Sequence, residues 1–480
     1  MNLHSALKTI VPDSTSTPDI HIPGIQFHSG KVKQGDLFVA IPGKNLDGHT
    51  YIKEAIKAGA AAVVGEMHMS DLEVPYFRVS NARLALAQIA SLFYNHPSRR
   101  HIMVGITGTN GKTTTAHMLR HILETAGVSC TLIGSVCQQI NGEEIQSTQT
   151  TPDALQLQQW LDYSHDQVVI MEVSSHGIDQ ERIGAIGYDF TVFTNLTHDH
   201  LDYHHTLEEY FETKARLFKQ MKSYGEAIVS SGCEWGKRLS DQLLTEGSPV
   251  HTFGEATLDQ LQITRVISAS PLEFDIQNGQ ENYTVSLPLS GVYNAWNASA
   301  AWLTARRMGV NPLTIQKALE TFPGVPGRFE MYKHPRGAEC IIDYAHTPDG
   351  LLQFLKTVRG LTDQRIIHIF GFRGNGDQSK RQPMFDISTG LSDLIILTLD
   401  DLKGAIADEL LTELREMASP YGLDTCVVIE DRTKAIEFAW ELARSGDIVV
   451  ITGKGTEAYD QSFALPCTSD RETIKYLIRT

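Results

Sequence analysis

One glycine-rich segment constrains what this chain can fold into more than any other part of its sequence: Gly105-Ile-Thr-Gly-Thr-Asn-Gly-Lys-Thr-Thr114. An apolar run typical of a buried strand precedes it at 102–106, and an amphipathic segment that predicts a helix follows at 113–126. At a strand–loop–helix junction, backbone N–H groups and the positive end of the helix dipole bind phosphate oxygens. The segment therefore predicts a phosphate-binding loop at the start of a helix.

The loop departs from the usual G-x-x-x-x-G-K-[ST] motif, because Ile106 stands five positions before Gly111. Lys112 would still neutralise phosphate oxygens, and Thr113 would hold Mg²⁺. A glycine-rich turn with a chance lysine is the alternative, which the strand–loop–helix context disfavours. The residues expected around the nucleotide phosphates are Gly108, Thr109, Asn110, Gly111, Lys112, Thr113 and Thr114.

Short apolar runs alternate with helical segments along the chain, which is typical of a parallel sheet covered by helices on both faces. The runs expected to be strands lie at 36–41, 60–65, 102–106, 168–172, 188–194, 227–230, 340–343, 366–370, 394–398 and 447–452. The sequence thus predicts an α/β fold, with a central P-loop-type mononucleotide-binding parallel sheet and a Rossmann-like C-terminal part.

The chain of 480 residues exceeds the roughly 250–300 residues at which a single hydrophobic core stops growing. We expect three domains, at residues 1–98, 99–327 and 328–480. His96-Pro-Ser-Arg-Arg100 interrupts the alternation of strands and helices, so Pro97–Arg100 is interpreted as a linker that contributes nothing to a core. Pro323-Gly-Val-Pro-Gly327 precedes the third α/β stretch.

The composition excludes several classes of protein. The net charge of −16, from 41 Lys and Arg against 57 Asp and Glu, repels polyanions such as nucleic acids. Apolar residues make up 41% of the chain, which excludes a disordered protein. No apolar stretch is long enough to span a membrane, and Met1–Pro18 lacks a secretory pattern. The six scattered cysteines are expected to be reduced and mostly buried. We expect a cytoplasmic protein that binds neither nucleic acid nor membranes.

Carboxylate and imidazole side chains gather where two predicted strands end. Glu172 ends the run 168–172, so its carboxylate would lie beside the phosphate loop if the two strands are neighbours, and it would suit Mg²⁺. A capping acid is the alternative. The segment 198–205 holds four His and two Asp within eight residues, yet it lacks a nearby cysteine and the H-E-x-x-H spacing of a zinc site. One or two of these residues would instead complete a Mg²⁺ and substrate shell.

At this point the sequence resembles the Mur ligase family, over nearly the whole chain and in the family's order. The segments that carry the resemblance are G-I-T-G-T-N-G-K-T-T at 105–114, E-V-S-S-H-G at 172–177, N-L-T-H-D-H-L-D-Y-H at 195–204, E-Y-F-E-T-K-A-R-L-F at 209–218, G-V-Y-N-A-W-N at 291–297, P-G-R-F at 326–329 and D-Y-A-H-T-P at 343–348. The segments 31–43, 47–49 and 453–457 narrow it to the MurE type, the UDP-N-acetylmuramoyl-tripeptide synthetases.

The resemblance implies an ATP-dependent amide ligase of peptidoglycan precursor synthesis, with roles in cell shape and division. A substrate carboxylate takes the γ-phosphoryl group of ATP, and an amino group then displaces phosphate from the acyl phosphate. The N-terminal domain would bind the UDP substrate, and ATP would lie between the central and C-terminal domains. Asn294 and Asn297 are implied near the adenine, Arg328 against the phosphates, Asp343 on the ribose and His346 nearby.

The resemblance also implies two Mg²⁺ ions. Thr113 and Glu172 would hold one, and His200 would help to hold the other. Lys214 is implied to be carbamylated, which converts an ammonium group into a carboxylate-like ligand. A solvated lysine, or one paired with an acid such as Glu209, is the alternative. Lys112, Lys214 and His200 are therefore the catalytic candidates.

Two binding regions are implied for the substrates. The UDP-muramoyl peptide would contact Ser29, Thr150, Thr151, Ser174, Gln180 and Arg182. Ser29 stands in His28-Ser-Gly30, where the family usually reads D-S-R. The free amino acid would contact Asp400, Asp401, Lys403, Gly453 and Glu457.

The amino-acid region departs from relatives that use diaminopimelate. They carry D-N-P-R, whose arginine pairs with a distal carboxylate, whereas this chain reads Asp400-Asp-Leu-Lys403. Two acids could receive a cationic side chain such as that of lysine, although Lys403 offsets part of their charge. Gly376 and Thr456 also replace an arginine and a histidine of the family motifs. The nucleotide machinery is therefore expected to be intact and the amino-acid pocket altered.

Three hypotheses follow from the sequence. The leading one is a monomeric ligase that adds an amino acid to a UDP-N-acetylmuramoyl dipeptide, without specifying that amino acid. The second is a paralogue that joins an amino acid to a different carboxylate. The third is a nucleotide-binding scaffold without turnover, which the retained set of chemical residues disfavours.

Overall fold

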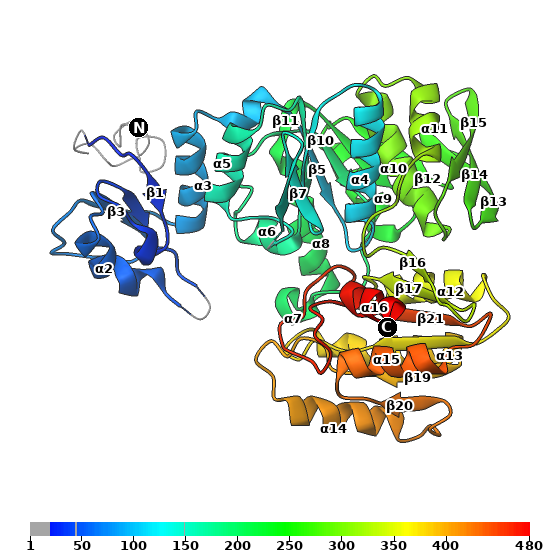
Figure 1. The fold of residues 1–480 in the computed structure, drawn as a ribbon. Coiled ribbons are helices and arrows are strands. Elements are labelled where there is room, and N and C mark those ends of the chain that lie inside the picture. Colours follow the sequence, from blue (N-terminus) through cyan, green and yellow to red (C-terminus); the bar gives the residue numbers. More distant parts are fainter. Residues whose placement is uncertain (1–19, 44–45, 148) are drawn as a thin grey trace. The chain divides into compact units, whose positions relative to one another are not determined.

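The computed structural model describes residues 20–43, 46–147 and 149–480, and they form two compact units. The first unit comprises the described residues up to Gly105 together with Ser129–Thr191 and Arg216–Gly225. The second comprises Ile106–Val128, Val192–Ala215 and Glu226–Thr480. Figure 1 shows the strands and helices of both units.

A small parallel sheet opens the first unit. Its strands are ordered β1 (Ile25–Gln26), β2 (Leu37–Val39), β3 (Ala62–Gly65) and β4 (Tyr76–Arg78), and α2 (Ile52–Lys57) lies between β2 and β3 in the sequence. Helix α3 (Ala82–Phe93) buries its alanines, Leu86 and Ile89 in the core that also holds Leu37, Val39 and Val64. The strands predicted at 36–41 and 60–65 are confirmed as β2 and β3.

The expected linker is instead a short 3-10 helix, Pro97–Arg100. Pro97 and Ser98 are buried, so the segment contributes to the packed interior rather than only joining two parts of the chain. The expectation that this segment contributes nothing to a core was therefore wrong, because proline is also favourable at the first position of a helical turn. The domain boundary near residue 98 stays a prediction.

The central sheet has eleven strands in the order β15-β14-β13-β12-β11-β10-β5-β9-β6-β7-β8. Strands β5 (Ile102–Thr107), β10 (Tyr188–Phe193) and β11 (Met221–Ser230) have residues in both units. The remaining strands are β6 (Cys130–Ile133), β7 (Cys137–Ile140), β8 (Glu143–Gln146), β9 (Val168–Glu172), β12 (Val250–Gly254), β13 (Leu261–Ala269), β14 (Leu272–Asn278) and β15 (Glu281–Leu287).

Both edges of this sheet are antiparallel, which the sequence analysis did not predict. Pairs β6–β7, β7–β8, β13–β14 and β14–β15 run antiparallel. Asn141 and Gly142 join β7 to β8 with φ values of 54° and 82°, the backbone that a two-residue hairpin turn requires. Asparagine followed by glycine is therefore the signal that could have predicted this hairpin.

Helix α4 (Lys112–Thr125), which follows the glycine-rich loop, packs against other helices of the second unit. It contacts α10 (Tyr293–Arg307) and α11 (Pro312–Glu320). Helices α7 (Leu201–His204) and α8 (Leu207–Ala215) follow β10, and α9 (Glu234–Thr245) follows β11. In the first unit, α5 (Ala154–Tyr163) and α6 (Ser175–Asp179) flank β9 in the sequence.

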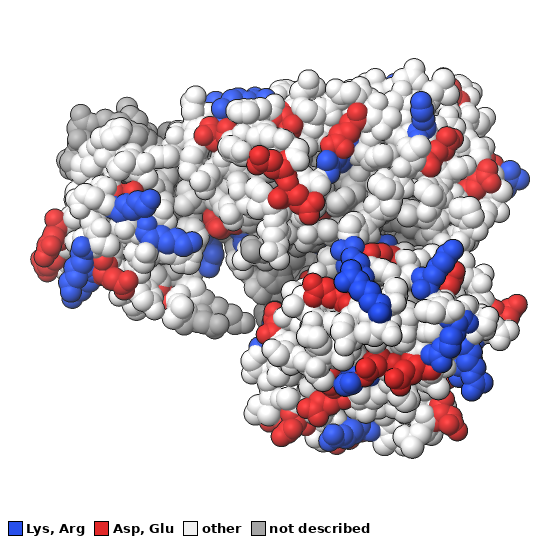
Figure 2. All heavy atoms as spheres, in the orientation of Figure 1, with Lys and Arg blue, Asp and Glu red and all other residues white. Residues whose placement is uncertain are grey.

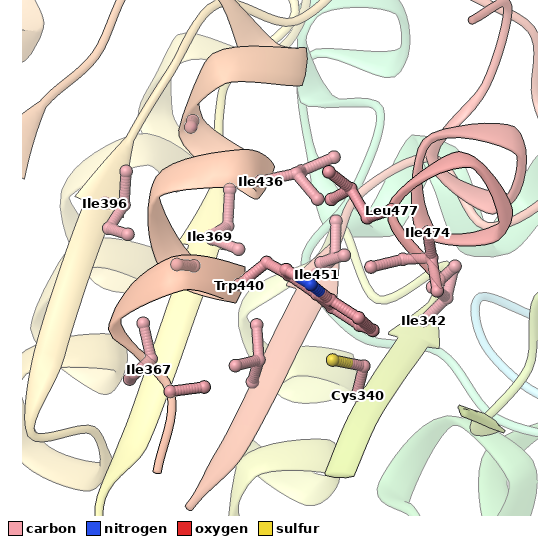
Figure 3. Packing of buried hydrophobic residues seen from close by; sticks show 14 of the residues in the cluster. Cys340, Ile342, Ile367, Ile369, Ile396, Ile436, Trp440, Ile451, Ile474 and Leu477 are labelled. Atoms are coloured by element: carbon pink, nitrogen blue, oxygen red, sulfur yellow. The ribbon is translucent and has the colours of Figure 1, made fainter. Parts of the chain in front are cut away.

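The C-terminal sheet is ordered β16 (Glu330–Lys333), β17 (Glu339–Asp343), β21 (Ile448–Thr452), β18 (Ile366–Phe370), β19 (Leu394–Leu397) and β20 (Cys426–Val428). Only the β16–β17 pair is antiparallel. Helices α15 (Arg432–Leu442) and α16 (Asp470–Arg479) share one core with the sheet, where Trp440 lies against Cys340 and Ile451 (Figure 3). The other core contains residues of α12 (Pro348–Arg359), α13 (Arg381–Leu391) and α14 (Ala407–Ala418).

Several class expectations can be compared with the structure. The mostly parallel sheets, with helices between successive strands, confirm the α/β class. The six cysteines are free, and all but Cys233 are buried. Within the described ranges, no helix is both long and apolar enough to cross a membrane. Figure 2 shows acidic and basic side chains interspersed on the visible face.

Candidate active site

Two glycines of the phosphate loop adopt backbone conformations that residues with a side chain rarely adopt. Gly111 is the N-cap residue of α4, with φ of 87°, and a Cβ atom there would lie 2.3 Å from Oδ1 of Asn297. Gly108 has φ of 148°, and a Cβ atom there would lie 1.9 Å from Oγ1 of Thr194. Side chains are excluded at both positions, so the backbone can approach a ligand at the positive end of α4.

Residues that follow β10 hold the loop in place. The N–H groups of Thr109 and Asn110 donate to the main-chain and side-chain oxygens of Asn195, both at 2.9 Å. Oγ1 of Thr194 donates to the carbonyl oxygen of Asn110 at 2.7 Å. Sequence reasoning missed these two supporting residues, although it singled out the segment that contains Asn195. Lys112 folds over the loop, where its Nζ donates to the carbonyl oxygens of Gly108 and Thr109 at 2.9 Å each.

The start of the C-terminal segment meets this loop. Nη2 of Arg328 donates to Oγ1 of Thr113 at 3.2 Å, and the guanidinium lies 4.1 Å from the ring centre of Tyr344. Nδ2 of Asn110 donates to Oδ2 of Asp349 at 3.1 Å. Arg328 therefore has the charge and position to contact phosphates bound at the start of α4, as its sequence prediction requires.

Other residues predicted for ATP lie at the end of β17 and in α10. Asp343 ends β17, and its oxygens accept from the N–H groups of Phe329 and Ala345 at 2.7 Å each. Burial raises the pKa of the Asp343 carboxyl, and these bonds and Arg328 oppose the shift. In α10, Nδ2 of Asn297 donates to Oδ1 of Asn294 at 3.1 Å. These residues lie in the second unit, and Asn297 borders the loop at Gly111.

A carboxylate that sequence reasoning left unassigned links the histidine-rich segment to the C-terminal part. Asp199 is 3% exposed, and its oxygens lie 3.1 Å from Nζ of Lys380, 3.4 Å from Nε2 of His200 and 3.7 Å from Nε2 of His346. Burial alone would raise the pKa of Asp199, but His200, His346 and Lys380 together hold it well below its ordinary value. A buried, ionised carboxylate therefore lies beside the predicted metal ligand His200.

A second acid fastens the same segment from the C-terminal part. Oδ2 of Asp377 accepts from the N–H of Leu201 and lies 3.2 Å from Nε2 of His198. The same His198 nitrogen lies 2.9 Å from Oγ of Ser379. These contacts restrain the turn at His200, whose φ of 56° is unusual for a residue with a side chain.

Lys214 lies inside the unit rather than in solvent. Its side chain is 1% exposed, its Nζ donates to the carbonyl oxygen of Gly108 at 2.9 Å, and the same atom lies 4.5 Å from the ring centre of Tyr210. Burial and the nearby Lys112 hold the pKa of Lys214 well below its ordinary value, against the opposing influence of Asp199. The solvated-lysine alternative is therefore excluded.

The predicted Mg²⁺ ligands differ in how well they suit the ion. The hydroxyl of Thr113 is an oxygen donor, as Mg²⁺ prefers. The amine of Lys214 is itself a hydrogen-bond donor, so it fits only after conversion to a carbamate. Within the described ranges, no three His, Cys, Asp or Glu side chains lie close enough together to hold a metal ion by themselves. By donor type alone, Thr113, His200 and a carbamylated Lys214 would suit Mg²⁺, whereas the unmodified lysine would not.

In the first unit, the residues predicted for the UDP substrate join Glu172 in one network. Glu172 accepts from the N–H and hydroxyl of Ser135 at 2.8 and 3.0 Å, and that hydroxyl lies 3.0 Å from Oγ1 of Thr150. Oγ1 of Thr151 lies 3.0 Å from the carbonyl oxygen of Glu172 and 3.1 Å from Oγ of Ser174.

Arginine extends this network. Arg182 donates to the carbonyl oxygen of Thr151 at 2.6 Å and to Oε1 of Gln180 at 2.8 Å. Five of the six predicted residues are therefore connected. Among the described residues, Ser29 makes no side-chain hydrogen bond to them, and it lies in the short 3-10 helix Ser29–Lys31.

The residues predicted for the free amino acid follow β19 and β21 at the carboxyl edge of the C-terminal sheet. Nζ of Lys454, which is fully buried, lies 3.3 Å from Oδ1 of Asp400 and 2.7 Å from Oδ2 of Asp401. Lys403 pairs with Asp460 and lies 3.9 Å from Asp401. Both acids thus have an internal cation, so the structure gives no support to the idea that they receive a cationic substrate side chain.

Comparisons with known proteins agree with this geometry. Three family models match the chain: "Mur ligase family, catalytic domain" at residues 21–94, "Mur ligase middle domain" at 106–305 and "Mur ligase, glutamate ligase domain" at 327–455. A UDP-N-acetylmuramoyl-L-alanyl-D-glutamate–2,6-diaminopimelate ligase of Clostridium botulinum is 36% identical, with all of both chains covered. The chain belongs to the Mur ligase family. It is accordingly an ATP-dependent acid–amino-acid ligase.

Other relatives extend the similarity of this Mur ligase. The ligase of the same name from Aquifex aeolicus is 38% identical, with 95% of this chain and 94% of the relative covered. A solved structure of a ligase with that name matches with a TM-score of 0.68 at 25% identity over 100% of both chains. MurF of Thermotoga maritima, solved with ADP, has a TM-score of 0.65 at 19% identity, covering 91% of this chain and 95% of its own, and so shares the fold.

Proposed function

We propose that this Mur ligase joins an amino acid to a UDP-N-acetylmuramoyl dipeptide in peptidoglycan precursor synthesis. The names of its 34–38% identical relatives support this acceptor, and so does the connected Thr150–Arg182 network of the first unit. The observation that carries the proposal is the contact of Arg328 with Thr113, because it joins a cation of the C-terminal segment to the start of the phosphate-loop helix.

Charge neutralisation is the first task of the site. A carboxylate that attacks the γ-phosphorus of ATP meets an anion, so the developing charge needs fixed cations and backbone donors. Lys112 and Arg328 would supply the cations, and the start of α4 would supply the N–H groups. The bond between the β–γ bridging oxygen and the γ-phosphorus breaks, ADP leaves, and the acceptor becomes an acyl phosphate.

Amide formation follows on the same enzyme. The amine of the incoming amino acid attacks the acyl carbon, phosphate leaves, and the nitrogen loses its proton. Water competes with the amine, so the contacts of Asn110 with Asp349, and of Lys380 with Asp199, would help to keep the site closed during this step.

We further propose that Thr113, Glu172, His200 and carbamylated Lys214 hold Mg²⁺. The ion would neutralise phosphate charge when bound. A buried lysine with a lowered pKa supports carbamylation, because the neutral amine is the form that attacks CO₂ and then loses a proton. The proposal also includes three domains, at residues 1–98, 99–327 and 328–480. It further includes a monomeric protein in the cytoplasm that binds neither nucleic acid nor membranes.

Purified protein tests the reaction. Phosphate should be released from ATP only when UDP-N-acetylmuramoyl-L-alanyl-D-glutamate and an amino acid are both present, and mass spectrometry of a pooled amino-acid reaction identifies the product. Lys112→Ala should abolish release, whereas Lys237→Ala on α9 should leave it unchanged. Absence of product with every amino acid supplied would refute the proposal.

The paralogue with another carboxylate substrate is the second candidate, and His28-Ser-Gly30 is the observation that favours it. Thermal unfolding separates the two. A UDP-muramoyl dipeptide at a hundredfold excess over its Kd should stabilise the chain by about 2.7 kcal/mol. No stabilisation at millimolar concentration would favour the paralogue.

A further inference from the structure

An arginine outside the predicted site residues lies among the candidate amino-acid contacts. Arg373 is in the loop after β18, and its Nη2 donates to Oε2 of Glu457. About one third of the Arg373 side chain and 38% of the Glu457 side chain are exposed, so a small molecule can reach this pair. By contrast, the buried Lys454 is enclosed with Asp400 and Asp401.

The loops around this pair pack closely. A Cβ atom at Gly374 would lie 2.2 Å from the carbonyl oxygen of Leu402, and one at Gly371 would lie 2.2 Å from that of Thr398. Strands β21, β18 and β19 are neighbours in the sheet, so the loops at their carboxyl ends meet at one edge. In open parallel sheets this edge is where ligands bind. Arg373 therefore occupies a binding edge on a firmly held loop.

A continuous series of contacts joins the pair to the phosphate loop. Arg328 donates to Thr113 and lies against the ring of Tyr344, and the hydroxyl of Tyr344 donates to Oε1 of Glu457 at 2.8 Å. Burial and Glu457 raise the pKa of Tyr344 to about 12, so this hydroxyl remains a donor at neutral pH. One aromatic side chain, Tyr344, thus separates Arg373 and Glu457 from Arg328, the cation that contacts the start of α4.

Arg373 has more N–H groups than hydrogen-bond partners among the described residues. A guanidinium has five N–H donors in a planar fork that matches a carboxylate. The buried Nε of Arg373 makes no hydrogen bond with any described residue. Glu457 has one oxygen on Tyr344 and the other on Arg373, so its charge is held beside the fork. An anion and a cation side by side match the charges of an amino acid.

We propose that Arg373 is a specificity-determining residue of this ligase, whose guanidinium binds a carboxylate of the incoming amino acid while Glu457 binds an ammonium group of the same molecule. The inference rests on the proposed function. The carboxylate is either the α-carboxylate, which every amino acid offers, or a distal one, which diaminopimelate offers. Lys454 neutralises Asp400 and Asp401, so recognition falls to the exposed Arg373–Glu457 pair.

Steady-state kinetics of Arg373→Gln test the inference. Loss of a charged hydrogen bond lowers binding by roughly 1.5–3 kcal/mol, so KM for the amino acid should rise about 10- to 100-fold. KM for ATP should stay unchanged, and Arg373→Lys should recover part of the loss because it keeps the charge. Arg471→Gln is the matched control, since Arg471 pairs with Glu330 in the same unit, and it should leave both constants unchanged.

Three amino acids distinguish the two carboxylates: L-lysine, L-lysinamide and diaminopimelate. If the α-carboxylate is bound, lysinamide has a high KM with the wild type and Arg373→Gln does not raise it further. If the distal carboxylate is bound, Arg373→Gln raises KM for diaminopimelate alone. Product formation with an amino-acid KM that Arg373→Gln leaves unchanged overturns the inference by itself. No product with the wild type overturns the proposed function as well. Thermal unfolding confirms that each variant is folded.

Discussion

Nζ of Lys214 lies 2.9 Å from the carbonyl oxygen of Gly108, so a lysine from α8 hydrogen-bonds to the phosphate loop itself. The contact brings a second amine to the loop that Lys112 already covers. Repulsion between the two favours a neutral Lys214, in addition to the effect of burial. Conversion to a carbamate would reverse the charge at this position and remove the repulsion.

Lys214→Arg should abolish ligase activity while keeping the protein folded. Arginine retains a positive charge but does not form a stable carbamate, so it deprives the proposed Mg²⁺ site of the carbamate oxygens. Phosphate release should fall by at least 100-fold, and ¹³C-bicarbonate should give a carbamate NMR signal in the wild type only. Lys222→Arg is the control, because Lys222 pairs with Asp189 outside the site. A carbamate signal that persists in Lys214→Arg would contradict the assignment.

Asp377→Asn should lower kcat by about tenfold. The carboxylate accepts from the N–H of Leu201 and faces His198, and a hydrogen bond to a charged group contributes about 1.5–3 kcal/mol. Without that charge the turn at His200 is less restrained, so the competent arrangement is less populated. Steady-state phosphate release measures the change. Asp386→Asn, at an exposed position of α13, should have no effect, and an unchanged kcat in Asp377→Asn would show that the turn needs no such restraint.

Stability should fall as the pH drops below 6.5, and His368 should account for part of the fall. Burial and Arg432 lower the pKa of His368 to about 3, while its ring nitrogens lie 2.7 Å from Oγ of Ser388 and 2.9 Å from Oγ1 of Thr452. Because the folded pKa is below the unfolded value of 6.5, the unfolded state binds more protons between these values. Each pH unit in this window costs about 1.4 kcal/mol.

Urea unfolding at pH 7.5, 6.5 and 5.5 checks this sign. In His368→Asn the loss of stability on acidification should be smaller than in the wild type, even though the variant is less stable at pH 7.5. Burial, Arg120 and Arg328 lower the pKa of His117 to about 4, so a residual slope of the same sign should remain. A pH dependence identical to the wild type would mean that His368 does not titrate differently in the two states.

Arg432→Met should destabilise the C-terminal part by about 3–5 kcal/mol, because it leaves Asp470 buried and unpaired. Both side chains are fully buried, and two bonds of 2.7 and 2.8 Å join them. The double variant Arg432→Met/Asp470→Leu should recover most of that loss, since it removes both charges. Denaturant unfolding of the four proteins in this cycle measures the coupling. Equal stabilities for the single and double variants would contradict it.

Local sequence patterns were enough to predict much of the framework. The strands at 168–172 and 366–370 agree residue for residue with β9 and β18, because each is a short apolar run bounded by polar residues. The phosphate loop was equally predictable, because two glycines and a lysine at the start of a helix are typical of phosphate binding. The antiparallel edges were not predicted from apolar runs, because strand direction depends on the connections between strands.

The candidate site, like the fold, could be predicted only in part from the sequence. By itself the sequence determined the family to which the chain belongs and the residue types expected to bind phosphate, because those types stand at fixed spacings within single segments. Only the tertiary structure decided that Lys454 neutralises Asp400 and Asp401, that Asp199 lies against Lys380, and that Arg373 is beside Glu457. These pairings join residues far apart in the chain, and the charge of such a group depends on which partners folding brings within a few ångströms.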